Sequence, residues 1–291
     1  MLLNNELTNK FSSLTQNVIH SGLVILSIRL EIRGAKGYST LKCAPKLYLL
    51  VPRVGYLICV IDALQDYYNS FDNRFSMLIE KNHHWFECDG FKINRLLNFS
   101  EYPIGLILDI YNKNGLQLCV SLVIVFEDKS GEKIERITFN EIDFVKKITN
   151  DIKLSQTLIL GDCRKFQMLS EKKYKYLIDL IYSLSVTTEK YESIYEEIFG
   201  KVEEIYNNTR NVPVKIYIKD KIFLKSFSRN INNRPLTIRD VLNDISSNLN
   251  ESYDDLLVIF HGIEIPIETP LICLLVSCSY IDGMIHLLLR I

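Results

Sequence analysis

The 291-residue chain lacks long apolar runs, an excess of basic side chains and any CxxC pair. A transmembrane helix needs about 18 consecutive apolar residues, and no stretch of the sequence approaches that length. The 34 basic and 35 acidic side chains nearly cancel, whereas general nucleic-acid binders carry a strongly basic surface. The sequence therefore predicts neither a membrane span nor a nucleic-acid partner.

Signals for secretion and disulfide bonding are also absent. The seven cysteines are scattered, and several lie inside apolar runs such as residues 56–61, where a free thiol behaves as a small hydrophobic side chain. Residues 1–10 are too polar for the apolar core of a signal peptide. With 47% hydrophobic and 24% charged residues, the chain has enough apolar material for a large core. We expect a soluble, cytoplasmic protein of two or three domains.

Residues 1–22 are predicted to form a short amphipathic helix. Leu7, Phe11, Leu14 and Val18 are spaced by four, three and four residues, which places them on one side of a helix. This apolar stripe is expected to lie against the protein's own core or against a partner.

The most informative feature is a pattern that occurs twice. Each copy is a strand, a turn containing glycine, a short return strand, a helical turn that begins at proline and a long final strand. The first copy covers residues 85–93, 102–110 and 118–126, and the second covers residues 257–265, 269–276 and 284–290. Two strands and a helix precede each copy, at residues 23–32, 47–51 and 54–71 and at residues 214–218, 223–227 and 237–245. Gly90 and Gly262 are expected at positive φ in the two hairpins.

This order of elements is that of a β-grasp, or ubiquitin-like, domain. Residues 139–206 have few glycines, no proline and helical apolar patterns, which predict two or three helices. The predicted fold class is α+β, with two ubiquitin-like β-grasp domains flanking a helix-rich middle domain, preceded by a short N-terminal helix. The predicted domains are residues 1–22, 23–136, 137–210 and 211–291.

No pattern in the sequence predicts an active site. His83, His84 and Cys88 have no second ligand pair at the spacing of a structural zinc site, which takes four ligands. Residues 34–37 hold a glycine pair beside a lysine but lack the spacing of a phosphate-binding loop. His261 is expected in a hairpin and has no partnered nucleophile. The sequence therefore predicts no catalytic residue, no metal and no cofactor.

The carboxylates Glu101, Asp109 and Glu268 are scattered and suggest no acid–base pair. One enzymatic class stays open, in which Cys88 or Cys273 acts as a nucleophile with a histidine. The sequence ends on its last strand without a glycine tail, and a ubiquitin-type modifier donates a flexible C-terminal glycine. A ubiquitin-like protein without that tail is expected to be an acceptor, a scaffold or a docking surface.

Five segments resemble the autophagy protein 5 family. They are residues 48–57, 85–90, 102–109, 261–264 and 268–271. The segments lie in both halves of the chain in the family's order, so the resemblance covers most of the sequence. It implies an N-terminal helix, a ubiquitin-like domain, a helical bundle and a second ubiquitin-like domain, in agreement with the pattern above.

The resemblance also implies a non-catalytic scaffold subunit of the autophagy conjugation machinery. In this family, a lysine of the helical middle takes the C-terminal glycine of the ubiquitin-like autophagy protein 12 as an isopeptide, or the partner is held non-covalently. The conjugate binds the coiled-coil autophagy protein 16. The assembly acts as an E3-like complex, which promotes transfer of autophagy protein 8 from the E2-like autophagy protein 3 to phosphatidylethanolamine. The implied location is the cytoplasm, with peripheral recruitment to pre-autophagosomal membranes through the complex during autophagosome formation.

The resemblance places the conjugation acceptor at Lys153. Its neighbours differ from the family's usual pattern, and Lys146 and Lys147 lie about two turns away on the same predicted helix. Residues 20–24 also depart from the family at the entry to the first domain. The alternative is a tandem ubiquitin-like-domain adaptor that binds other partners non-covalently.

Overall fold

The computed structural model describes residues 22–33, 44–76, 83–88, 91–93, 102–111, 119–127, 141–183, 188–218, 221–249, 256–278 and 280–290. These residues belong to two compact units. The first is made of Leu23–Phe144 and Ile181–Ser185, and the second mainly of Val145–Leu180 and Val186–Ile291. The predicted N-terminal helix lies outside the described residues.

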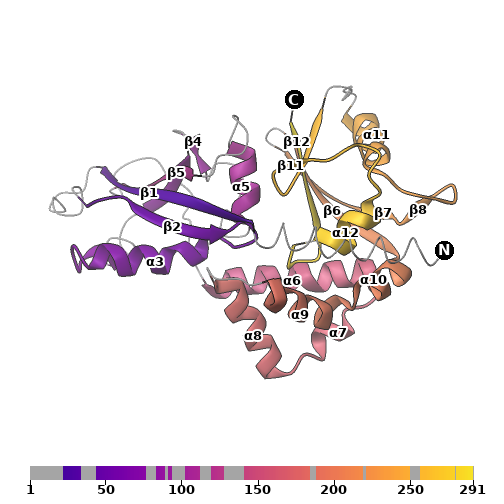
Figure 1. The fold of residues 1–291 in the computed structure, drawn as a ribbon, viewed down its shortest axis with the longest axis horizontal. Helices are drawn as coiled ribbons and strands as arrows, with labels where there is room; N and C mark the ends of the chain where they lie inside the picture. Colours follow the sequence, from indigo (N-terminus) through magenta and orange to yellow (C-terminus); the bar gives the residue numbers. More distant parts are fainter. Residues whose placement is uncertain are drawn as a thin grey trace. The chain divides into compact units, whose positions relative to one another are not determined.

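The first unit is a five-stranded mixed sheet with a long helix against it. Its elements in chain order are β1 (Leu23–Arg33), β2 (Leu47–Pro52), α3 (Ile58–Asn69), β3 (His83–Cys88), β4 (Phe91–Lys92), α5 (Ile104–Tyr111) and β5 (Cys119–Glu127). The strand order is β2-β1-β5-β3-β4, in which β1 and β5 are parallel and the other pairs are antiparallel. This is the order of a β-grasp domain, and α3 runs along β1 and β2 (Figure 1).

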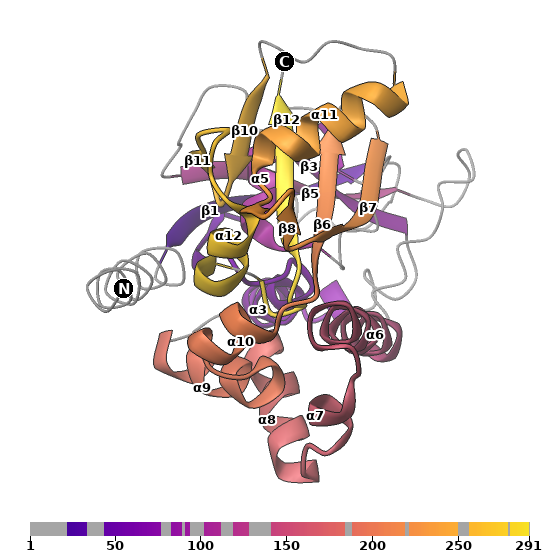
Figure 2. The same ribbon diagram turned by 90° about the vertical axis from the view of Figure 1, so that its right-hand side faces the viewer.

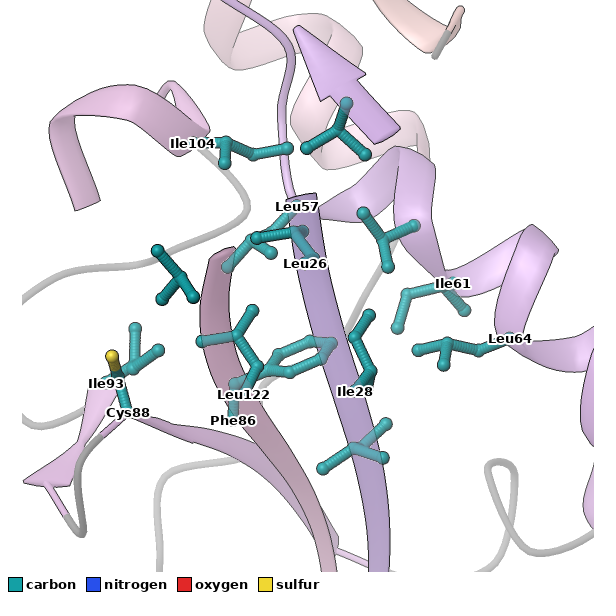
Figure 3. Packing of buried hydrophobic residues seen from close by; sticks show 14 of the residues in the cluster. Leu26, Ile28, Leu57, Ile61, Leu64, Phe86, Cys88, Ile93, Ile104 and Leu122 are labelled. Carbon is teal, nitrogen blue, oxygen red and sulfur yellow. The ribbon is translucent and has the colours of Figure 1, made fainter. Parts of the chain in front are cut away.

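The core of the first unit lies between α3 and the sheet. Alternate side chains of a strand point to the same face, so Leu26 and Ile28 of β1 both point toward the core. Both are fully buried. Ile61 and Leu64 of α3 approach them from the helix (Figure 3). Tyr68 lies in the same cluster; its hydroxyl donates to the Ile28 carbonyl at 3.3 Å, and burial raises its pKa to about 12. The apolar pattern of residues 54–71 is thus the face that α3 buries.

Two of the segments that resemble the family meet at the start of α5. The Ile104 N–H donates to the Gly55 carbonyl at 2.7 Å, and the Gly105 N–H donates to the Arg53 carbonyl at 2.8 Å. The Arg53 guanidinium also pairs with Asp109 at 2.5 Å. A Cβ at Gly105 would lie 2.8 Å from the Arg53 Cβ, so glycine permits this close approach. Both segments therefore serve the packing of the first sheet and its helices.

The second unit contains a sheet of the same topology. Its elements are β6 (Asn211–Ile218), β7 (Lys221–Ser228), β8 (Asn230–Ile231), β9 (Arg234–Pro235), α11 (Ile238–Leu249), β10 (Leu257–Phe260), β11 (Ile263–Glu264), α12 (Leu271–Cys278) and β12 (Ile285–Arg290). The strand order β7-β6-β12-β10-β11 repeats that of the first sheet, with β6 and β12 parallel. Helix α11 crosses the face of β12 and β6 (Figure 2). The predicted α+β fold with two β-grasp domains is therefore confirmed.

The hairpin between β10 and β11 turns through His261, with φ 52°, and Gly262, with φ 81°. Two consecutive residues at positive φ are typical of the type I′ turn that closes two-residue hairpins. The prediction for Gly262 is confirmed, whereas Gly90 lies outside the described residues. A further hairpin, β8–β9, turns at Asn232 and Asn233 and was not expected from the sequence.

Residues between the two sheets form more helices than the pattern predicts. They are α6 (Glu141–Leu160), α7 (Arg164–Gln167), α8 (Glu171–Tyr182), α9 (Thr188–Phe199) and α10 (Val202–Asn208). The prediction of two or three helices is wrong, because Gly161 at φ 95° and Gly200 at φ 100° end α6 and α9 and let the chain start new helices. In the second unit, α6 and α10 lie next to the end of the sheet where β6 and β12 begin (Figures 1 and 2). None of the helices in the described ranges is both long and apolar enough to cross a membrane.

Candidate functional site

Helix α6 carries the predicted acceptor, Lys153, and two further lysines. Lys146 is exposed, whereas Lys147 and Lys153 are half-buried. Lys146 and Lys153 are seven positions apart, which is about two helical turns, so these two lysines lie on one face, about 10 Å apart along the axis. Lys147 is turned away from that face by about 100°. Lys146 and Lys153 therefore share one side of α6, and Lys147 points to another.

The side chain of Lys153 lies against an aromatic ring. Its Nζ is 5.7 Å from the ring centroid of Phe166 in α7, which is within the range of a cation–π contact. Phe166 is only 5% exposed, and its backbone N–H donates to Oε1 of Gln156 at 3.2 Å. The ring of Tyr174 meets it edge-on, with 6.2 Å between centroids. The ring beside the Lys153 amine is thus held by contacts on two sides.

Lys147 instead belongs to a buried cluster of charges. Its Nζ lies 2.7 Å from Oδ2 of Asp151, one turn later on α6. Lys215 of β6 reaches the same oxygen at 2.9 Å and Oδ2 of Asp282 at 3.1 Å. Although burial alone would lower the pKa of Lys215, the charges of Asp282 and Asp151 raise it above the ordinary lysine value. Two lysines and two aspartates balance in charge, and the cluster joins α6 to the second sheet.

His286 of β12 extends this cluster. Its Nε2 lies 2.9 Å from Oδ2 of Asp282, and its Nδ1 lies 2.9 Å from the Tyr217 hydroxyl. Burial lowers the pKa of His286, which favours the neutral imidazole. A neutral ring with its proton on Nε2 donates to Asp282 and accepts from Tyr217. Burial alone would raise the pKa of Asp282, but the Lys215 charge and hydrogen bonds from His286 and Met284 hold it well below the usual range.

Two uncharged side chains also anchor α6 beside Lys153. Ser155 and Gln156 are fully buried. The Ser155 hydroxyl donates to the backbone carbonyl of Asp282, and the Gln156 amide donates to the carbonyl of Ile198 in α9. The acceptor candidate therefore sits on a stretch of helix that is held on both sides of it in sequence, at Asp151 and at residues 155–156.

In the described part of the chain, the carboxylates and histidines weighed from the sequence as catalytic or metal-binding candidates do not form such a site. Asp109 and Glu268 each pair with an arginine of the same sheet domain, while Glu101 and the side chains of His83 and His84 lie outside the described ones. No group of three or more histidine, cysteine, aspartate or glutamate side chains in the described ranges is placed to hold a metal ion.

The cysteines give no support to a thiol nucleophile. Cys88 is 1% exposed. Burial raises the pKa of Cys273, and it raises the pKa of Cys59 to about 12. A reactive thiol needs a lowered pKa and access to solvent. Cys88 lacks the access, and Cys59 and Cys273 have a raised pKa.

Sequence reasoning missed the buried charge cluster. Lys215 lies in an apolar strand, where a single charge among β-branched residues is the available signal. Asp282 and His286 flank the start of another apolar strand in the same way. Lys215 is 64 residues from Asp151 of α6 and 67 residues from Asp282, so the pairing itself is visible only in the fold.

Two sheets of one ubiquitin-like topology, separated in the sequence by a helical segment, define a tandem ubiquitin-like protein. Comparison with known proteins narrows this class. Residues 19–126 match the family model of the autophagy protein ATG5 UblA domain, and residues 211–289 match that of the UblB domain. The chain belongs to the autophagy protein 5 family.

Individual relatives agree with this assignment over most of the chain. The autophagy-related protein 5 of Caenorhabditis elegans is 22% identical over 252 residues, which are 83% of this chain and 86% of the relative. Autophagy protein 5 of Pichia angusta is 21% identical over 280 residues, 94% of each chain. The crystal structure of Kluyveromyces marxianus Atg5 shares the fold with a TM-score of 0.73 at 17% identity, covering 96% of this chain and 100% of that chain. Membership of this family supports a role for this protein in autophagy conjugation.

Proposed function

We propose that this chain is a scaffold subunit without an active site of its own, and that Lys153 accepts the C-terminal glycine of autophagy protein 12. The observation that carries the proposal is the placement of Lys153: its side chain is half-exposed, on a helix anchored at Asp151, Ser155 and Gln156. A fixed helix presents an amine in one direction, which is what an incoming carbonyl requires.

The covalent step is the aminolysis of a thioester. The neutral Lys153 amine attacks the carbonyl carbon of the C-terminal glycine, which the conjugating enzyme of autophagy protein 12 carries on its cysteine. The C–N bond forms, the C–S bond breaks, the sulfur leaves as a thiolate, and the nitrogen gives one proton to solvent. Because the thioester already activates the carbonyl, this chain contributes the position of the amine and needs no catalytic dyad.

The E3-like role rests on docking. We assign the conjugate, together with the coiled-coil autophagy protein 16, to an E3-like complex that promotes transfer of autophagy protein 8 from the E2-like autophagy protein 3 to phosphatidylethanolamine. The outward face of β1 and β2 supports a docking role, because Leu23, Ile25, Tyr48 and Leu50 are 39% to 62% exposed there. Neighbouring exposed apolar side chains mark sites of protein association. The complex would act at pre-autophagosomal membranes, to which this cytoplasmic chain is recruited peripherally.

The acceptor role is tested by co-expression with autophagy protein 12 of the same species and its conjugating enzymes. We expect an adduct that survives denaturing gels, is largely lost in Lys153→Arg and persists in the matched control Lys146→Arg. Co-migration on native gels alone would contradict the acceptor role of Lys153 and leave a non-covalent scaffold. No association under either condition would favour the alternative, a tandem ubiquitin-like adaptor for other partners.

A further inference from the structure

The three lysines of α6 have three different surroundings. The Lys147 ammonium is engaged by Asp151 at 2.7 and 2.9 Å. The Lys153 amine lies at the face of the Phe166 ring. Within the described residues, Lys146 is exposed and makes neither kind of contact. A donor that approaches α6 therefore meets one lysine in an ion pair, one against a ring and one directed to solvent.

We propose that Phe166 is a positioning residue for the acceptor: its ring seats the Lys153 side chain, so that α6 offers Lys153 and not Lys146 or Lys147 to a glycine thioester. This inference rests on the proposed acceptor function. Phe166 lies within cation–π range of the acceptor amine in the resting protein and takes no part in the bond changes of aminolysis.

A seat is effective only if it is more rigid than the side chain it holds. A lysine side chain has four rotatable bonds and loses considerable rotamer entropy when it is fixed. Phe166 is buried, its N–H is bonded to Gln156, and Gln156 is itself bonded to α9. Because Gln156 lies on α6 three residues after Lys153, the seat and the acceptor are tied to the same helix.

The ion pair of Lys147 supports the same selection. Asp151 is shared with Lys215, so release of Lys147 would leave a buried carboxylate with one partner fewer. The cluster that anchors α6 therefore keeps the Lys147 amine in an ion pair and away from an incoming thioester. The remaining competitor is Lys146, which shares a face with Lys153 but lacks the ring.

The first test is chemical and needs no partner. The whole folded chain is labelled briefly with acetic anhydride, and the ratio of label on Lys153 to label on Lys146 is read by mass spectrometry. The ring covers one side of the Lys153 amine, so Phe166→Leu should raise this ratio about two- to five-fold, the factor of a modest cation–π contact. Phe166→Tyr should keep the original ratio. Tyr206→Leu, which removes the ring beside Arg229 elsewhere in the second unit, should leave it unchanged.

The second test is the distribution of the enzymatic adduct between the same two lysines. Phe166→Leu should lower the share at Lys153 relative to Lys146 by about the same two- to five-fold, opposite in sign to the chemical labelling. Partial unfolding changes both lysines together and so does not move the ratio in opposite directions. Phe166→Tyr should restore the wild-type distribution.

The outcomes separate the two claims. An adduct that forms at Lys153 in the wild-type chain and keeps its distribution in Phe166→Leu would overturn the positioning role and leave the proposed function intact. An unchanged labelling ratio in Phe166→Leu would overturn the seat directly. A wild-type chain that forms no adduct would overturn the acceptor function and the positioning role with it.

Discussion

Replacing Lys215 by methionine removes the cation at the centre of the buried cluster. The side chains of Lys215, Asp151 and Asp282 are only 9%, 11% and 4% exposed. Without Lys215, the two aspartates retain Lys147 and the neutral His286 as partners, and the cluster carries an uncompensated negative charge. Breaking a buried ion pair by deleting one partner costs about 3–5 kcal/mol. We expect Lys215→Met to lower the free energy of unfolding by an amount in this range.

The assay is urea unfolding at pH 7, followed by circular dichroism, with an exposed ion pair as control. Lys173 and Glu197 are 2.6 Å apart but 50% and 42% exposed, so Lys173→Met should cost no more than about 1 kcal/mol. The double variant Lys215→Met with Asp282→Asn should lose less than the sum of the two single variants, because one orphaned carboxylate is gone. Equal, small losses for Lys215→Met and Lys173→Met would refute the claim that buried charges anchor α6 to the second sheet.

Three further predictions concern other parts of the chain. Because burial lowers the pKa of His286, the unfolded chain binds a proton near pH 6.5 that the folded chain does not bind. As the pH drops below 6.5, the free energy of unfolding should therefore decrease by up to about 1.4 kcal/mol per pH unit. In urea unfolding between pH 5 and 7, His286→Asn should make this free energy less dependent on pH. Gly262→Val places a β-branched residue at φ 81° and should cost about 1–2 kcal/mol, seen as a lower melting temperature; an unchanged melting temperature would contradict the type I′ turn. Deleting residues 1–20 should weaken binding of the coiled-coil partner in calorimetry, and unchanged affinity would mean that the stripe of Leu7 and Phe11 has no part in binding that partner.

The topology was predictable because its signals are local and occur twice. Strand periodicity, the proline before each short helix and the glycine at 262 all follow from neighbouring residues. The structure places the equivalent prolines alike: Pro103 bridges to Tyr56 in the first sheet domain, and Pro270 bridges to Thr237 in the second. The fold class could therefore be predicted from a pattern that occurs twice with the same order of elements.

The candidate site was predictable only in part. Lys153 came from the family resemblance, because a surface lysine has no local signature of its own. Phe166 was not identified, since its contact with Lys153 depends on the break at Gly161 that turns α7 back beside α6. The partnership of Asp151 with Lys215 depends on tertiary structure in the same way, across 64 residues.

Reconstituted lipidation tests the central claim most directly. Autophagy protein 8 loaded on autophagy protein 3 is mixed with vesicles that contain phosphatidylethanolamine, with or without this chain in complex with autophagy proteins 12 and 16. We expect faster formation of the lipidated product when the complex is present and no product from this chain alone. A rate that is the same with and without the complex would contradict the E3-like role.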